Sequence, residues 1–122
     1  MPLTTTRVLL VEDEVIIRMM LADMIEQLGH AVTAEAGELG RATELAQTGL
    51  FDLAILDVNL KGKMSFPAAS ILMERRIPLI FASGYATDSF PAAFRSMPRL
   101  QKPFRIDTLA RAIAAAREGV RD

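Results

Sequence analysis

The chain has 122 residues with a formal net charge of -1, from 14 basic and 15 acidic side chains, which leaves no electrostatic footprint for nucleic acid or an anionic membrane. It has no cysteine and a single histidine, which excludes disulfides, thiolate metal sites and histidine-rich zinc sites. No apolar run reaches the length of a membrane span or a signal-peptide core, so we expect a soluble, cytoplasmic protein with a single domain over residues 1–122.

Strand-like apolar runs alternate with helix-period segments, the order that produces a parallel sheet covered on both faces. The first strand is predicted at 7–11 and the first helix at 14–28, where Gly29 ends the helix in a left-handed turn. The next strand, at 30–36, alternates apolar and polar residues and should lie at a sheet edge. A weaker helix follows at 39–48. The first helix carries apolar residues at helical spacing, namely Ile16, Ile17, Met20, Leu21, Met24 and Leu28.

The central strand is predicted at 52–57 and is apolar between its two acidic ends, as a strand covered on both faces requires. A loop at 58–65 leads to a helix at 66–75. The fourth strand is predicted at 77–82, with Pro78 at its start because proline cannot donate to an interior ladder.

The stretch at 84–99 carries weak helix signals, because glycine and prolines interrupt it, so we expect mobility there and at most a turn or two of helix. A short fifth strand at 100–101 precedes an alanine-rich helix at 105–118. Together these elements predict an α/β fold with a doubly wound five-stranded parallel sheet. The expected strand order is 2-1-3-4-5, as in flavodoxin-like folds, with a shortened or irregular fourth helix.

Carboxylates follow two of the predicted strands directly. Glu12 and Asp13 come after the first strand, and Asp57 ends the third. In the predicted order these strands are parallel neighbours, so the three carboxylates should meet at the chain reversal, where ligands bind in such sheets. Like charges in one cleft cost free energy unless a cation, a proton or a hydrogen-bond donor offsets them. Ser83 and Lys102 end the fourth and fifth strand regions on the same rim.

This set of groups suits phosphoryl transfer to a carboxylate. A Mg²⁺ ion would be held by Asp13 and Asp57 directly and by Glu12 through water. Asp57 would then be the nucleophile that attacks phosphorus and forms an acyl phosphate. Lys102 would supply a charge, and Ser83 a hydroxyl donor, to the remaining phosphoryl oxygens.

Four short motifs, in this order, resemble those of the receiver domains of two-component response regulators, and the match covers almost the whole chain. The resemblance implies phosphorylation of Asp57 by a histidine kinase or a histidine phosphotransfer protein, with the main-chain carbonyl of Asn59 as a further Mg²⁺ ligand. It also implies a cis peptide bond between Lys102 and Pro103. The motifs are Val-Glu-Asp-Glu at 11–14, Leu-Asp-Val-Asn-Leu at 56–60, Ala-Ser-Gly at 82–84 and Lys-Pro-Phe at 102–104.

The sequence departs from the usual receiver pattern at Arg99, three positions before the lysine, where an aromatic switch residue is expected. The run Pro-Leu-Ile-Phe-Ala-Ser-Gly-Tyr at 78–85 instead resembles the receiver subgroup nicknamed FAT GUY, known from alphaproteobacterial stress signalling, with Ser83 for the usual threonine. In that subgroup the fourth helix is reduced or absent. The resemblance makes Tyr85 the candidate switch aromatic.

These observations favour a stand-alone receiver, a phosphorylation-dependent interaction module rather than an enzyme. An aspartate-nucleophile phosphohydrolase is the alternative, but Asn59 stands where such a hydrolase usually carries a second acid, and the short chain offers no cap for a substrate. A module that binds partners without phosphorylation is a further alternative, against which the complete acidic set argues. The downstream partner and homodimerisation are left open, while Met1 and the charged end favour a complete protein.

Overall fold

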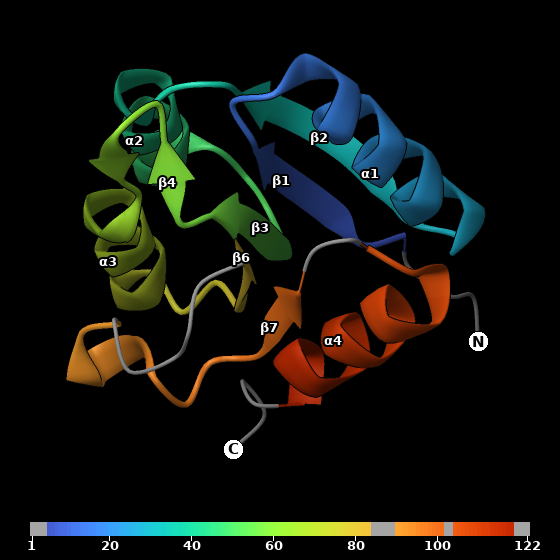
Figure 1. Ribbon diagram of the computed structural model, residues 1–122. Helices are drawn as coiled ribbons and strands as arrows, with labels where there is room; N and C mark the ends of the chain where they lie inside the picture. Colours follow the sequence, from blue (N-terminus) through green and yellow to red (C-terminus); the bar gives the residue numbers. More distant parts are fainter. Residues whose placement is uncertain (1–4, 84–89, 102–103, 119–122) are drawn as a thin grey trace.

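The computed structural model describes residues 5–83, 90–101 and 104–118. Figure 1 shows a twisted sheet with helices packed on both of its faces. Helices α1 (Val15–Gln27) and α4 (Ile106–Glu118) lie on one face, and α2 (Leu39–Thr48) and α3 (Phe66–Glu74) lie on the other. Among the helices of these residues, none is long and apolar enough to cross a membrane.

The sheet confirms the predicted topology. Its five strands are parallel throughout and lie in the order β2-β1-β3-β6-β7, so the first two strands of the chain lie on one side of β3 and the last two on the other. Every residue of β3 is buried, whereas the edge strand β2 is mostly half-exposed, as its alternating sequence predicted. The strands are Arg7–Val11 (β1), Ala31–Ala36 (β2), Leu53–Asp57 (β3), Leu79–Ser83 (β6) and Arg99–Gln101 (β7).

Alternate residues of the central strands pack into two separate cores, because successive side chains of a strand point to opposite faces. Leu9 and Leu56 belong to the core under α2 and α3. Leu10 and Ile55 belong to the core under α1 and α4. The strands are therefore held from both sides, which fixes the positions of the residues that follow their ends.

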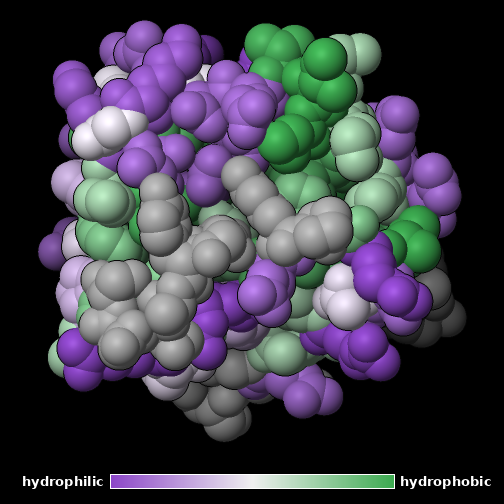
Figure 2. All heavy atoms as spheres, in the orientation of Figure 1, coloured by the Kyte–Doolittle hydropathy of each residue, from purple (hydrophilic) through white to green (hydrophobic). Residues whose placement is uncertain are grey.

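The first helix has a wider apolar face than the sheet covers. Leu21 is fully buried, as is Ile25 one turn later. Ile16, Met19 and Met20, in contrast, are 74%, 62% and 46% exposed, although Ile16 and Met20 share the predicted helical spacing. Figure 2 shows hydrophobic surface over the start of α1, at the top of the molecule.

The predicted loop at 58–65 contains a small hairpin. Strands β4 (Asn59–Leu60) and β5 (Lys63–Met64) are antiparallel, and the turn residues Lys61 and Gly62 both have positive φ, at 52° and 88°. This is the geometry of a tight two-residue hairpin turn, in which glycine carries no steric cost at the second position. The sequence prediction missed the hairpin because a two-residue strand has no periodicity to detect.

Between β6 and β7 the described residues hold a 3-10 helix, η2 (Ala92–Phe94), where an α-helix would cover the sheet in a regular fold of this type. This agrees with the predicted irregular fourth helix. Phe90 and Phe94 pack with Phe66 and Phe81, with ring centroids 5.2–5.8 Å apart. Aromatic packing thus fills this part of the core. The predicted mobility of 84–99 rests partly on residues outside the described ranges.

Two helices end in the same turn with different residues. After α1 the left-handed position is Gly29, with φ 91°, and after α3 it is Arg76, with φ 61°. In both turns this residue and the next donate their N–H groups to carbonyls in the last helical turns. A left-handed conformation costs an ordinary residue roughly 1 kcal/mol, because Cβ approaches the following carbonyl oxygen. Arg76 therefore occupies a position where glycine would relax the backbone.

We expect Arg76→Gly to raise the free energy of unfolding by about 0.5–1 kcal/mol, because it removes this strain. Urea denaturation measures the change. The matched control is Gly29→Ala, since a Cβ at Gly29 meets no atom within 4 Å and only the backbone conformation is tested. That control should lose about 1 kcal/mol. A destabilised Arg76→Gly variant would show that the arginine side chain contributes more by packing than its backbone costs.

Candidate functional site

The three carboxylates predicted from the sequence meet at the carboxyl edge of the sheet. Parallel pairing places Val11 of β1 opposite Leu56 of β3, so the residues that follow these two strands are neighbours. One oxygen atom from each of Glu12, Asp13 and Asp57 lies within 4.8 Å of the other two. The predicted convergence is confirmed, and it follows from the register of two strands.

Burial makes this convergence costly. Glu12 is 0% and Asp57 6% exposed, and Asp13 is half-buried. Backbone donors support the acidic pair: the N–H of Glu14 donates to Glu12 Oε2 at 3.0 Å, and the N–H of Lys61 donates to Asp13 Oδ2 at 3.0 Å. Such neutral donors reduce the cost of desolvating a carboxylate but leave the repulsion between carboxylates in place.

The chemistry of this donor set fits a hard cation. Magnesium and calcium bind carboxylate and carbonyl oxygens, whereas zinc and copper sites use imidazole or thiolate ligands. The cluster contains only carboxylates, and its oxygens are close enough for one ion to contact more than one of them. The geometry therefore supports the predicted ligands Glu12, Asp13 and Asp57 for an ion such as Mg²⁺.

Arg18 holds the backbone that carries the acidic pair, a role that the sequence analysis did not identify. Its NH1 group donates to the main-chain carbonyl of Glu12 at 2.7 Å, and its Nε forms an ion pair with Glu35 at 3.0 Å. A Cβ at Gly37 would lie 2.7 Å from the same NH1 group. Glycine there leaves room for the arginine. The sequence signal that could have identified this role is an arginine, Arg18, one turn after the acidic pair, together with a glutamate, Glu35, on the predicted edge strand.

Asn59 uses its side chain inside the hairpin. Its Oδ1 accepts a hydrogen bond from the N–H of Gly62 at 2.7 Å, which closes the turn between β4 and β5. Lys61 of the same turn reaches Asp13 through its backbone N–H. The hairpin is thus tied to the acidic cluster by main-chain atoms. That the main-chain carbonyl of Asn59 is a Mg²⁺ ligand stays a prediction.

The fourth strand ends beside Asp57. Asp57 pairs with Ala82, so the backbone of Ser83 follows directly at the same carboxyl ends of the strands, and the role of its hydroxyl stays a prediction. The roles predicted for Lys102 and Tyr85, and the peptide bond between Lys102 and Pro103, lie outside the described residues.

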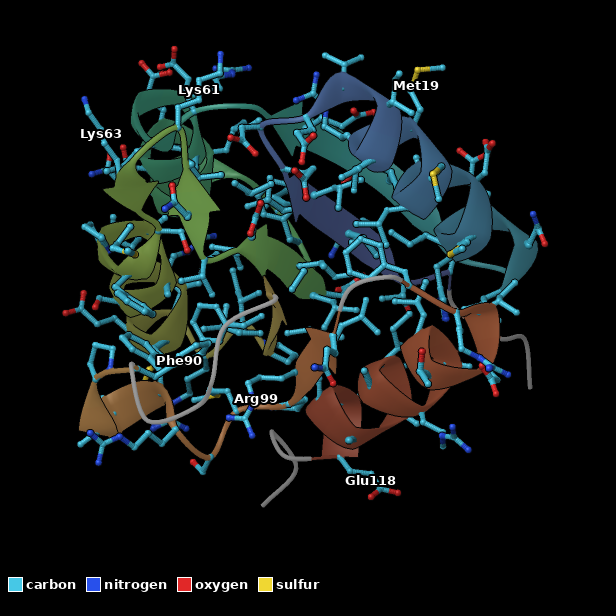
Figure 3. The ribbon with its side chains drawn as sticks, in the orientation of Figure 1. Met19, Lys61, Lys63, Phe90, Arg99 and Glu118 are labelled. Atoms are coloured by element: carbon cyan, nitrogen blue, oxygen red, sulfur yellow. The ribbon has the colours of Figure 1, made fainter. Side chains whose placement is uncertain are left out.

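Arg99 stands where the usual receiver pattern has an aromatic residue. Its guanidinium carbon lies 5.8 Å from the centroid of the Phe90 ring, and its NH1 group donates to the carbonyl of Arg95 at 3.0 Å. Figure 3 labels Arg99 near the start of β7 and Phe90 near the 3-10 helix that precedes it. The arginine therefore lies over the aromatic cluster, held by a cation–π contact and a backbone acceptor.

Comparisons with known proteins identify a family. Residues 8–114 match the sequence profile described as "Response regulator receiver domain". The chain is 37% identical over 114 residues to "Transcriptional regulatory protein PdtaR" of Mycobacterium tuberculosis, a match that covers 90% of this chain but only 56% of that protein. The chain thus spans little more than half the length of this relative.

Two solved structures are similar over nearly their full length. The solution structure of SdrG from Sphingomonas melonis Fr1 has 43% sequence identity and a TM-score of 0.82, and the match covers 92% of this chain and 96% of SdrG. The REC domain of the response regulator PhyR from Erythrobacter litoralis has 30% identity and a TM-score of 0.78, covering 92% of this chain and 89% of that one. Both relatives are alphaproteobacterial, in agreement with the subgroup that the run at 78–85 resembles.

Repulsion within the acidic cluster predicts that removing one charge stabilises the metal-free protein. In the presence of a chelator, Asp13→Asn should raise the melting temperature by an amount equivalent to about 1 kcal/mol. Thermal unfolding followed by circular dichroism measures this. Asp23→Asn, which removes an exposed carboxylate from α1, is the control and should leave the melting temperature unchanged. If both variants melt like the parent, solvent and backbone donors already relieve the repulsion.

Proposed function

Since this chain belongs to the response regulator receiver domain family, we propose that it is a receiver in a two-component phosphorelay in which Asp57 accepts a phosphoryl group. The phosphodonor would be a histidine kinase or a histidine phosphotransfer protein. The observation that carries this proposal is the cluster of Glu12, Asp13 and Asp57 at the carboxyl edge of the sheet. Of these, Asp57 ends the central strand and so has the most rigid support.

The proposed reaction transfers the phosphoryl group from nitrogen to oxygen. A carboxylate oxygen of Asp57 attacks phosphorus, the bond between phosphorus and the donor imidazole breaks, and the imidazole leaves with its bonding electron pair. An acyl phosphate on Asp57 is the product. Bound Mg²⁺ would offset the negative charge that gathers on the phosphoryl oxygens and the carboxylates. Asp13, Asp57 and the carbonyl of Asn59 would hold it directly, and Glu12 would do so through water.

Other residues of the rim complete the proposal. The Ser83 hydroxyl and the Lys102 ammonium would contact the phosphoryl oxygens that the metal does not, one as a hydrogen-bond donor and the other as a charge. Tyr85 would respond to this change as the switch aromatic, a role supported by the sequence run at 78–85. Arg99 supports the switch role of Tyr85 indirectly, because an arginine stands at the position where receivers usually carry the switch aromatic.

The start of α1 supports a protein as phosphodonor. Val15, Ile16 and Met19 are 56%, 74% and 62% exposed, and they follow the acidic pair within a few residues. Figure 3 shows Met19 at the outer surface of α1. Exposed apolar side chains gathered beside a polar site are typical of a protein contact, since their burial stabilises a complex. A partner seated there would bring its histidine toward Asp57.

The receiver family consists in general of signalling modules rather than enzymes, and Asn59 speaks against the phosphohydrolase alternative. Its Oδ1 is bonded within the hairpin, so the position two residues after Asp57 offers neither a carboxylate nor an unoccupied amide oxygen. The remaining alternative is a module that acts without phosphorylation. It differs from the proposed receiver in that Asp57 would not be phosphorylated, which can be measured.

Metal binding should depend unequally on the acidic pair. Asp13→Asn should weaken Mg²⁺ binding more than Glu12→Gln, because Asp13 is proposed as a direct ligand and Glu12 as a ligand through water. Calorimetric titration of each variant measures the two affinities. Equal losses would contradict this ranking of the ligands.

Phosphorylation is tested with a small phosphodonor. With acetyl phosphate and Mg²⁺, intact mass spectrometry should detect a single phosphoryl adduct on the parent protein and none on Asp57→Asn. Asp52→Asn is the matched control, because it changes the aspartate directly before the start of the same strand and should keep the adduct. Undiminished incorporation in Asp57→Asn would remove the assigned acceptor, and a parent without any adduct would favour a phosphorylation-independent module.

A further inference from the structure

A cleft of about 440 Å³ lies at the amino ends of the strands, on the opposite side of the sheet from the acidic cluster at their carboxyl ends. It lies at the amino ends of β1, β3 and β6, where the ends of α3 and α4 also arrive. The receiver chemistry proposed above takes place at the other edge and uses none of its residues. Its lining combines Asp52 and the apolar side chains of Leu50 and Phe51 with four arginines, namely Arg7, Arg75, Arg76 and Arg117.

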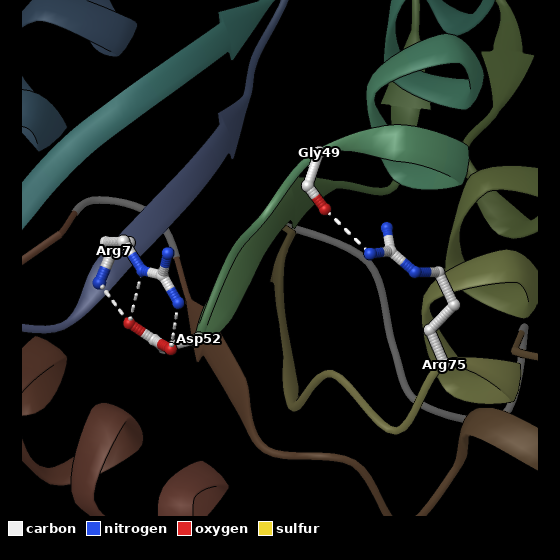
Figure 4. Close-up of polar contacts among 4 residues, drawn as sticks. All are labelled: Arg7, Gly49, Asp52 and Arg75. Atoms are coloured by element: carbon white, nitrogen blue, oxygen red, sulfur yellow. Dashed lines mark hydrogen bonds and ion pairs between the residues drawn. The ribbon is translucent and has the colours of Figure 1, made fainter.

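The cleft is strongly positive. Four of the chain's 14 basic residues line it, with only one of the 15 acidic residues, although the whole chain has a net charge of -1. That acidic residue, Asp52, is engaged by Arg7, whose Nε and NH2 groups each lie 3.1 Å from a different carboxylate oxygen (Figure 4). The hydrogen bonds from Arg7 hold the pKa of Asp52 below its ordinary value. The carboxylate thus stays charged and fixes the position of one arginine.

A second arginine is held in place by main-chain acceptors. Arg75 donates from NH1 to the carbonyl of Ala46 at 2.6 Å. From NH2 it donates to the carbonyl of Gly49 at 2.8 Å (Figure 4). Carbonyl groups carry no net charge, so the positive charge of Arg75 is not neutralised by these bonds. The side chains of Arg7 and Arg75 are therefore already held by hydrogen bonds within the protein, so a ligand would not lose affinity by having to order them.

The other two arginines supply the available charge. Within the part of the chain that the structure describes, neither Arg76 nor Arg117 forms an ion pair, although after Arg7 the charge of Arg117 also helps to lower the pKa of Asp52. Arg76 occupies the left-handed position after α3, where the equivalent turn after α1 has glycine. The chain therefore places a guanidinium at a backbone position that favours glycine. Arg117 lies in the last turn of α4, across the cleft from α3.

The cleft also has an apolar part. Leu50 is 70% exposed on its rim, and Phe51 is half-buried in its wall. A second hollow, of about 790 Å³, shares Arg76, Ile77 and Pro78 with the first and continues over methionine, proline and alanine side chains. A single small anion would leave these apolar surfaces uncovered. A ligand that combines carboxylates with apolar side chains would cover both hollows.

From this charge and shape we infer that the arginine cleft is a docking site for an acidic segment of a partner protein. The carboxylates of the segment pair with Arg76 and Arg117, and an apolar side chain between them packs against Leu50 and Phe51. Because the cleft lies away from Asp57, the interaction does not require phosphorylation.

Fluorescence anisotropy tests this with a labelled peptide of glutamate and serine that carries a central leucine. The parent should bind the peptide, and binding should weaken as salt is added, because the contacts are between exposed charges. Arg76→Gly and Arg117→Gln should each weaken binding about twofold to fivefold. Arg76→Gly serves well here because the substitution suits its backbone conformation. Arg111→Gln, which changes an exposed arginine of α4 outside the cleft, should bind as the parent does.

Three results would overturn the inference. Equal binding by the parent, Arg76→Gly and Arg117→Gln would place the peptide elsewhere. Competition by inorganic phosphate that exceeds the effect of chloride at the same ionic strength would assign the cleft to a small anion. Equal binding of a peptide with serine in place of the leucine would show that the apolar contact does not contribute, and that only nonspecific charge attraction holds the peptide.

Discussion

The parallel pairing of β1 with β3 is the constraint on which the rest of this structure depends. It sets Val11 beside Leu56, and through them it forces the buried Glu12 and Asp57 into one small volume. Cores on both faces of the sheet hold this register, since a slip by one residue would turn Leu9 and Leu10 to the wrong sides. The energy of apolar packing is therefore what keeps three like charges together.

The two edges of the sheet carry opposite charge. Carboxylates lie at the carboxyl ends of β1 and β3, while arginines lie at the amino end of β1 and at the ends of α3 and α4. The overall charge of -1 averages over this separation and hides it. A parallel sheet makes the separation feasible, because all strand starts meet at one edge and all strand ends meet at the other. The proposed cation site and the proposed docking site for an acidic segment are therefore separated, so that neither neutralises the other.

The segment before β7 shows how a missing helix is replaced. Phe90 and Phe94 reach the aromatic cluster around Phe66, and Arg95 and Arg99 tie the segment together through main-chain carbonyls and the Phe90 ring. Large aromatic side chains bury much apolar surface per residue, so a short 3-10 helix can seal the core where an α-helix would otherwise lie. The regular backbone hydrogen bonds of this segment are confined to its short 3-10 helix and the adjoining turn, so side-chain packing provides much of its stability.

The sequence by itself determined the strand order, the buried central strand and the acidic cluster, because hydrophobic periodicity and strand-end carboxylates are local signals that a parallel sheet brings together in a known way. Tertiary structure alone decided which apolar residues of α1 stay exposed, because spacing defines a helix face but not how far the sheet covers it. It alone placed Arg18 on the carbonyl of Glu12, and it alone gathered four arginines into one cleft. Those arginines come from three separate segments, at Arg7, at Arg75 and Arg76, and at Arg117, and no local sequence pattern indicates that these segments meet at the amino ends of the strands.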